Sequence, residues 1–229
     1  MKGTLFGVGV GPGDPELLTL KALRLIKEAE RIAVPGKRPE DSVAYKIVKE
    51  IYPELSRKKL LAVPMPMTKD PEKLETAHEE GAKMIREELE QGNNVVFLTL
   101  GDPTVYSTYL YIHKRIMAWD YPVEIVSGVT SFCAAAAKLN ISLVEKAEEL
   151  HVIPASYQIE EALKLPGTKV LMKAGKKMCQ VKDSIRAQGA EAVMVENCGM
   201  ESEKIYGSVD EIPDDAGYYS LIIVKDQQY

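Results

Sequence analysis

The sequence contains few of the residues that build disulfide frameworks or metal sites. Its 229 residues include 3 cysteines and 3 histidines, and the cysteines form no CxxC motif. An odd number of widely spaced cysteines favours a reducing compartment over a disulfide framework. Because the histidines and cysteines also lack the spacing of zinc ligands, no metal site is expected.

Long apolar runs and an excess of positive charge are also absent. No segment approaches the length of a transmembrane helix, and the first residues lack a signal-peptide pattern. The expected location is therefore the cytoplasm, without a membrane partner. The net charge is -5, whereas nucleic-acid-binding proteins usually carry a basic surface. No nucleic-acid partner is expected, although a local cluster of Lys and Arg could still bind a small anion.

The sequence does contain 45% hydrophobic residues, and its first half alternates short apolar runs with amphipathic segments. Such alternation is typical of an α/β fold with a largely parallel sheet. The predicted strands span residues 5–10, 31–34, 60–63 and 95–100, and the predicted helices span 16–29, 42–51, 72–91 and 104–117.

After Asp120 the pattern changes, because several β-rich segments follow one another without an intervening helix. Strands are predicted at residues 123–126, 151–154, 169–172, 192–196, 203–207 and 219–224, with helices at 129–139 and 176–188. This succession favours a mixed sheet. The sequence therefore predicts two α/β domains: residues 1–120 with a largely parallel sheet, and residues 121–229 with a mixed sheet.

Two of the predicted strands run into a Gly-Asp-Pro motif, at Gly13-Asp14-Pro15 and Gly101-Asp102-Pro103. Glycine lets the backbone approach a ligand closely, whereas Asp and Pro are favoured where a helix begins. A third pair, Asp70-Pro71, has no strand or glycine immediately before it. Functional significance is therefore expected from the strands and glycines. Asp14 is expected mainly to cap a helix, and Asp102 to have a functional role.

The glycine spacing argues against two common nucleotide sites. A dinucleotide fingerprint needs GxGxxG, but the third glycine is replaced by Pro12 or by Asp14 in the two possible registers. No Gly-Lys-Ser/Thr follows either loop, which excludes a P-loop. A phosphate at these helix starts would also meet the carboxylate of Asp14 or Asp102. A cofactor of mixed charge such as S-adenosylmethionine (SAM) fits better, although the residues alone do not single it out.

Three segments together resemble the signatures of the tetrapyrrole methylases, which are SAM-dependent enzymes acting on corrinoid and sirohaem precursors. The segments are residues 8–20, 99–103 and 127–131, and the family more often has proline in place of Ser127. The resemblance extends from about residue 3 to residue 225. It implies two α/β domains with a cofactor cleft between them, and it suggests a homodimer.

Within this family the chain is most similar to the precorrin-2 / cobalt-factor II C20-methyltransferases of cobalamin biosynthesis. The similarity lies in residues 3–5, 64–67, 107–109 and 219–224. It implies methyl transfer from SAM to C20 of a tetrapyrrole, with any cobalt arriving inside the substrate. The alternatives are a related methylase acting on another precorrin, uroporphyrinogen III or diphthine, and a non-catalytic nucleotide-binding module.

The resemblance also implies the residues of the site. The implied SAM contacts are Pro12, Leu100, Gly101, Asp102, Val105, Thr130, Ser131, Met172, Cys198 and Ser220. No catalytic residue is assigned, because the C20 carbon is already nucleophilic and water or a substrate carboxylate could accept its proton. Lys37 and Arg38 are candidates to bind the substrate carboxylates, with a solvated charge pair as the alternative. Tyr106 is the tyrosine most expected to reach the site.

Overall fold

The computed structural model describes residues 2–155 and 159–226, and the chain divides into two compact units. Unit 1 is Met1–Thr130 and unit 2 is Ser131–Tyr229. The division therefore falls later than the boundary near residue 120 that the sequence pattern predicts. The reason is that strand β5 (Val123–Val126) pairs with the first strand of unit 1, with Val123 opposite Leu5. A pairing between such distant residues has no signature in the local sequence.

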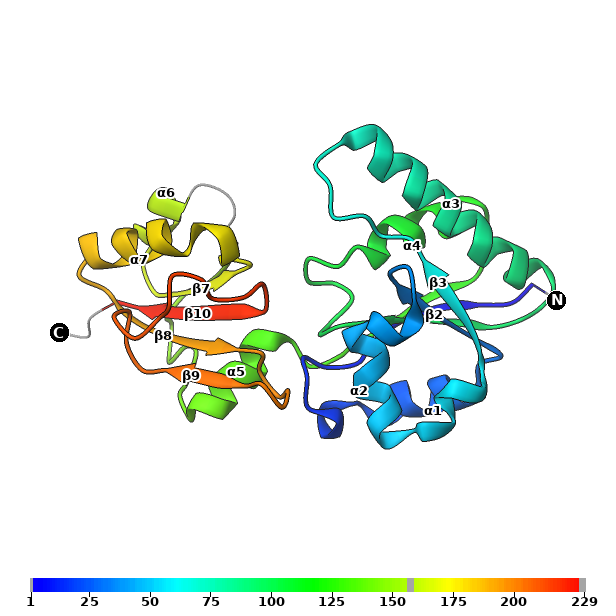
Figure 1. Cartoon of the computed structure of the whole chain (residues 1–229), viewed down its shortest axis with the longest axis horizontal. Coiled ribbons are helices and arrows are strands. Elements are labelled where there is room, and N and C mark those ends of the chain that lie inside the picture. The colour runs from blue at the N-terminus through cyan, green and yellow to red at the C-terminus, as the bar shows by residue number, and fades with distance from the viewer. Residues whose placement is uncertain (1, 156–158, 227–229) are drawn as a thin grey trace. The chain divides into compact units, whose positions relative to one another are not determined.

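The sheet of unit 1 is entirely parallel, with strand order β3-β2-β4-β1-β5. Its other strands are β1 (Leu5–Gly9), β2 (Arg31–Pro35), β3 (Lys59–Val63) and β4 (Val95–Thr99). Helices α1 (Leu20–Glu28) and α2 (Val43–Ile51) cover one face, and α3 (Pro71–Glu90) and α4 (Tyr109–Ala118) cover the other (Figure 1). All of β4 is buried, as expected for a parallel strand covered on both faces. The predicted parallel sheet is confirmed.

The topology of unit 1 identifies the edge at which a ligand is expected. Strands β1 and β4 are neighbours, but α1 follows β1 on one face whereas α4 follows β4 on the other. In open α/β sheets, ligands bind beyond the carboxyl ends of the strands at such a switch point. The loops after β1 and β4, which contain the two Gly-Asp-Pro motifs, lie at this point.

Two helices of unit 1 begin later than the sequence predicts. Asp14 caps only a 3₁₀ turn, Pro15–Leu17, and α1 begins at Leu20 with Thr19 as its N-cap, because Thr19 has an extended backbone. Helix α4 begins at Tyr109 instead of residue 104, because Tyr106 has a φ of 49°, which a right-handed helix does not contain. Neither motif therefore opens directly into an α-helix.

A buried carboxylate ties the amino ends of β2 and β3 to α3, on the opposite edge of the same sheet. Glu88 accepts hydrogen bonds from Arg31 Nε at 2.6 Å, Lys59 Nζ at 2.5 Å and Asn93 Nδ2 at 2.9 Å. Burial by itself raises the pKa of Glu88, but these donors outweigh burial and hold its pKa below the usual value. The ionised carboxylate therefore stabilises this edge.

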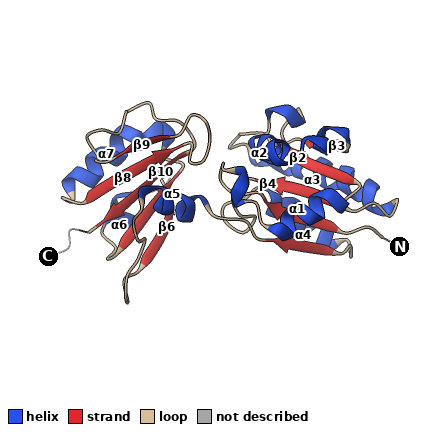
Figure 2. Ribbon diagram, turned by 90° about the horizontal axis from the view of Figure 1, so that it is seen from below, coloured by secondary structure: helices blue, strands red, loops and turns tan. Residues whose placement is uncertain are grey.

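Unit 2 contains a mixed sheet with strand order β6-β7-β10-β8-β9 (Figure 2). Strands β6 (Leu150–Pro154) and β7 (Thr168–Met172) are parallel, whereas β8 (Glu191–Glu196), β9 (Lys204–Tyr206) and β10 (Ser220–Lys225) join through antiparallel pairings. Its helices are α5 (Ser131–Leu139), α6 (Ile159–Leu163) and α7 (Met178–Ala187). The predicted mixed sheet is confirmed. Within the described residues, no helix is both long and apolar enough to span a membrane.

Candidate functional site

The loops after β1, β4 and β5 meet through glycine backbone. Gly101 N donates to Gly11 O at 2.8 Å, and Gly11 N donates to Gly101 O at 3.3 Å. A Cβ on Gly9 would lie 2.6 Å from Gly101 O, and a Cβ on Gly128 would lie 2.2 Å from the same oxygen. Side chains therefore cannot be accommodated at Gly9 or Gly128 without moving the backbone. We call Gly9, Gly11, Gly101 and Gly128 the glycine junction.

Asp102 connects two of the loops that form this junction. Its side chain is buried, and Oδ1 accepts from the backbone N of Thr104 at 2.8 Å and from Thr104 Oγ1 at 2.5 Å. Oδ2 accepts from Gly128 N, in the loop after β5, at 3.0 Å. Asp14 accepts only the local hydrogen bond from Glu16 N, at 2.9 Å. The two Gly-Asp-Pro motifs therefore differ: one aspartate caps a turn, and the other links separate loops.

Two buried hydroxyl groups belong to the same strand ends. Thr99 is the last residue of β4, and Thr130 follows β5 by a few residues. Within the described part of the chain, neither Oγ1 has a hydrogen-bond partner. Since buried polar atoms are nearly always paired, both hydroxyls are candidates to bond a ligand. Thr130 is one of the contacts predicted from the sequence, whereas Thr99, which begins the second signature segment, is a candidate that only the structure adds.

The predicted cofactor contacts of unit 1 lie at this carboxyl edge of the sheet. Pro12, Gly101 and Asp102 are buried, whereas Leu100 and Val105 are half-buried. Pro12 comes from the loop after β1, and the other four come from the loop after β4. Residues of two loops that are far apart in the sequence are thus brought to one switch point.

The predicted contacts of unit 2 gather at one edge of the second sheet. Met172 ends β7 and lies opposite Leu221, next to Ser220 at the start of antiparallel β10. Cys198 is buried and follows the end of β8, which pairs with β10 at the same edge. Ser131 is the first residue of α5, which packs against β10. The structure therefore groups Met172, Cys198 and Ser220.

The predicted substrate contacts, Lys37, Arg38 and Tyr106, lie in the loops after β2 and β4. Arg38 forms two hydrogen bonds to Asp41, at 2.9 and 2.7 Å, and these hold the pKa of Asp41 below its usual value. Lys37 is exposed and has no ion pair with any described residue. Tyr106 is 45% exposed at a φ of 49°, a strained conformation for a bulky residue that is typical of functional loops.

The histidines of unit 1 are packed between side chains. His78 stacks on Tyr111 with ring centroids 4.5 Å apart, and His113 Nδ1 lies 2.9 Å from the hydroxyl oxygen of Tyr109. Burial lowers the pKa of both histidines. In the described ranges, no group of three His, Cys, Asp or Glu side chains is arranged to hold a metal ion.

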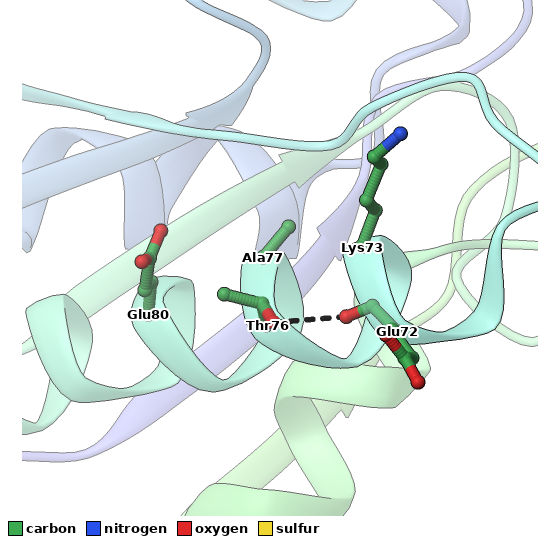
Figure 3. Close-up of a pocket in the computed structure, with 5 residues that line it drawn as sticks. All are labelled: Glu72, Lys73, Thr76, Ala77 and Glu80. Atoms are coloured by element: carbon green, nitrogen blue, oxygen red, sulfur yellow. Dashed lines mark hydrogen bonds between the residues drawn. The ribbon is translucent and has the colours of Figure 1, made fainter.

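A surface depression on α3 is not part of this site (Figure 3). The residues that line it all come from that one helix: Glu72, Lys73, Thr76, Ala77 and Glu80. The hydroxyl of Thr76 donates to the backbone oxygen of Glu72 at 2.8 Å, as Figure 3 shows. Four of the five side chains are exposed, and no glycine loop or unpaired buried group contributes. The depression has none of the features found at the switch point.

The sequence also matches a known protein family, and this match agrees with the geometry of the candidate site. Residues 4–213 match the family described as Tetrapyrrole (Corrin/Porphyrin) Methylases. The chain therefore belongs to the tetrapyrrole methylase family, as its three signature segments predicted.

Individual relatives show which enzymes within this family the chain is similar to. The chain is 37% identical over 226 residues to a probable cobalt-precorrin-2 C(20)-methyltransferase of Methanocaldococcus jannaschii, covering 96% of this chain and 95% of that one. It is 30% identical to a precorrin-2 C(20)-methyltransferase of a Sinorhizobium species, covering 97% and 95%. Among solved structures, uroporphyrin-III C-methyl transferase from Thermus thermophilus, complexed with S-adenyl homocysteine, has a TM-score of 0.72 at 22% identity. The two structures match over 97% of each chain, and this match supports the fold.

Proposed function

We propose that this protein is a SAM-dependent methyltransferase that methylates C20 of precorrin-2 or cobalt-factor II in cobalamin biosynthesis. The observation that carries the proposal is the glycine junction at the switch point. It occurs in a chain that matches two C20-methyltransferases over nearly its full length. These two relatives favour this function over methylation at another position and over a non-catalytic nucleotide-binding module.

The residues at the junction fit SAM. The close packing of Gly9 and Gly128 against Gly101 O holds together the strand ends that carry Thr99 and Thr130. The unpaired hydroxyls of Thr99 and Thr130 suit the polar groups of SAM. When bound, SAM supplies an electrophilic methyl group. The proposed contacts are Pro12, Leu100, Gly101, Asp102, Val105 and Thr130 from unit 1, with Ser131, Met172, Cys198 and Ser220 from unit 2.

The role proposed for the protein is to bind SAM and the substrate, to orient them toward each other, and to exclude water. The C20 carbon of the substrate is already nucleophilic, so no activated side chain is needed. Alignment of two reactants can contribute about 7–11 kcal/mol to lowering a barrier. The C20 proton leaves to water or to a substrate carboxylate in this scheme.

For substrate binding, Lys37 is the stronger of the two proposed cations. Arg38 is already engaged by Asp41, whereas Lys37 has no ion pair with any described residue. A carboxylate of the tetrapyrrole would therefore bind Lys37 without displacing a protein partner. Tyr106, exposed in the neighbouring loop, is proposed to contact the macrocycle. The protein is further proposed to be a homodimer located in the cytoplasm.

Two measurements test this function. The protein is expected to bind SAM and S-adenosylhomocysteine at micromolar concentration, and to bind NAD and ATP more weakly than either. Incubation with SAM and either metal-free precorrin-2 or cobalt-factor II, followed by NMR, should locate a new methyl group at C20. Tighter binding of NAD than of SAM would refute the methyltransferase, and methylation at another carbon would refute the position. Comparing the two substrates decides whether cobalt is required.

A further inference from the structure

We propose that the loop between β3 and α3, residues 64–70, forms part of the substrate site, with Met67 against the tetrapyrrole ring and Lys69 at one of its carboxylates. The proposal rests on the proposed function and adds a further segment to its substrate site. Residues 64–67 are one of the segments in which the chain resembles the C20-methyltransferases, and none of the contacts proposed above comes from them.

The loop leaves the sheet at the same edge as the loop that contains Lys37. Strands β2 and β3 are parallel neighbours, and Gly36 N donates to Val63 O at 2.9 Å where the two loops begin. Figure 1 shows residues 64–70 as the extended connection from the end of β3 to the start of α3. Because neighbouring strands lie about 4.8 Å apart, a ligand as large as a tetrapyrrole that binds Lys37 can extend to this loop.

The loop is fixed on both sides of Met67. Before it, Met65 is half-buried and packs against the core between the sheet and helices α3 and α4. After it, Thr68 N donates to Pro66 O at 3.0 Å, which closes a three-residue turn with Met67 at its centre. Asp70 N donates to Thr68 Oγ1 at 3.1 Å. An ordered loop loses little conformational entropy when a ligand binds, so it is suited to recognition.

Met67 presents apolar surface to the solvent. It is 87% exposed, the largest value among the large apolar side chains of the described residues. A methionine side chain is flexible and polarizable, so it adapts to irregular apolar surfaces and makes favourable contacts with aromatic rings. A tetrapyrrole ring offers such a surface on each face. Because single exposed apolar residues are common on proteins, the choice of ligand also depends on the charges beside Met67.

These charges are two lysines in the neighbouring loops. Lys37 and Lys69 are exposed, and neither forms an ion pair with any residue in the described ranges. Asp70, by contrast, pairs with Lys73. Two cations without ion-pair partners beside an exposed methionine, in a chain of net charge -5, match a ligand with an apolar body and several carboxylates. The proposed tetrapyrrole is such a ligand, whereas a small polyanion would leave Met67 without a contact.

The experiment compares Met67→Gln and Lys69→Gln with the wild type in steady-state kinetics, using metal-free precorrin-2 and cobalt-factor II at saturating SAM. Met67→Gln should raise the KM for the tetrapyrrole about threefold to tenfold, because apolar contact with the ring is lost. Lys69→Gln should raise it about 1.4-fold to fivefold, as for an exposed ion pair. The kcat and the KM for SAM should not change, because these contacts bind the ground state and the transition state alike.

Met117→Gln and Lys49→Gln are the matched controls. Both residues are exposed and lie in the last turns of α4 and α2, which precede the amino ends of β5 and β3, at the opposite edge of the sheet. Neither control should change the KM for the tetrapyrrole. Circular dichroism should show the same fold in all four variants, since every substituted side chain is exposed.

Three results would overturn the proposal while leaving the methyltransferase in place. They are wild-type KM values in both loop variants, a loss of SAM affinity in Met67→Gln, and a Met67→Gln monomer beside a wild-type dimer in sedimentation. The last result would identify the loop as a contact between copies of the chain. A wild-type protein that methylates neither tetrapyrrole refutes the proposed function, and this proposal with it.

Discussion

Substituting Gly128 with alanine tests whether the glycine junction is as tightly packed as the structure indicates. The added Cβ would lie 2.2 Å from Gly101 O and 2.8 Å from the backbone C and Cα of Gly9, whereas ordinary contacts begin at 3.4 Å. Backbone atoms would have to move by about 1.2 Å, the difference between 3.4 and 2.2 Å. Overpacking of this kind costs about 1–3 kcal/mol, which is a large part of a typical stability of about 5–15 kcal/mol.

The assay is urea denaturation followed by fluorescence of Trp119, the sole tryptophan, which belongs to unit 1 and packs against its core. Circular dichroism of the whole protein, which reports the helices and strands of both units, provides the second probe of unfolding. Gly207→Ala is the control, because a Cβ there meets its nearest neighbour, the Glu211 carboxylate, at an ordinary 3.6 Å. It should change stability by less than about 0.5 kcal/mol. Equal stability of Gly128→Ala and wild type, together with unchanged SAM affinity, would refute the close-packed junction.

Two further predictions concern charged groups of unit 1. Glu88→Gln should destabilise the protein by about 1–3 kcal/mol at neutral pH. Because the pKa of Glu88 is depressed in the folded state, its contribution is complete above the usual value of about 4.3 and is lost as the pH falls through the lower folded pKa. Urea midpoints of wild type and variant should therefore converge in acid, and a constant difference would contradict the assignment. Lys37→Ala should raise the KM for the tetrapyrrole about 1.4-fold to fivefold, since an exposed ion pair contributes about 0.2–1 kcal/mol. Arg38→Ala should have a smaller effect, because Asp41 already binds that side chain, and steady-state kinetics showing the reverse order would contradict this reasoning.

Much of the fold was predictable because its signals are local. Apolar runs at β1, β2 and β4 and the amphipathic pattern of α3 are properties of short segments, and each element lies close to its predicted position. Helix starts were predicted less well. The Asp-Pro pair at residue 70 does begin a helix, but Tyr106 and Thr19 interrupt the two others through their backbone conformations.

The sequence by itself determined the α/β class, the family and the loops that contain the glycines. Tertiary structure decided that β5 completes the first sheet, that Gly9, Gly101 and Gly128 come into contact, and that Asp102 links loops while Asp14 only caps a turn. The physical reason is that these features depend on pairing between distant segments. A glycine has the same freedom in any sequence, but its close contacts exist only once the strands carrying it lie side by side.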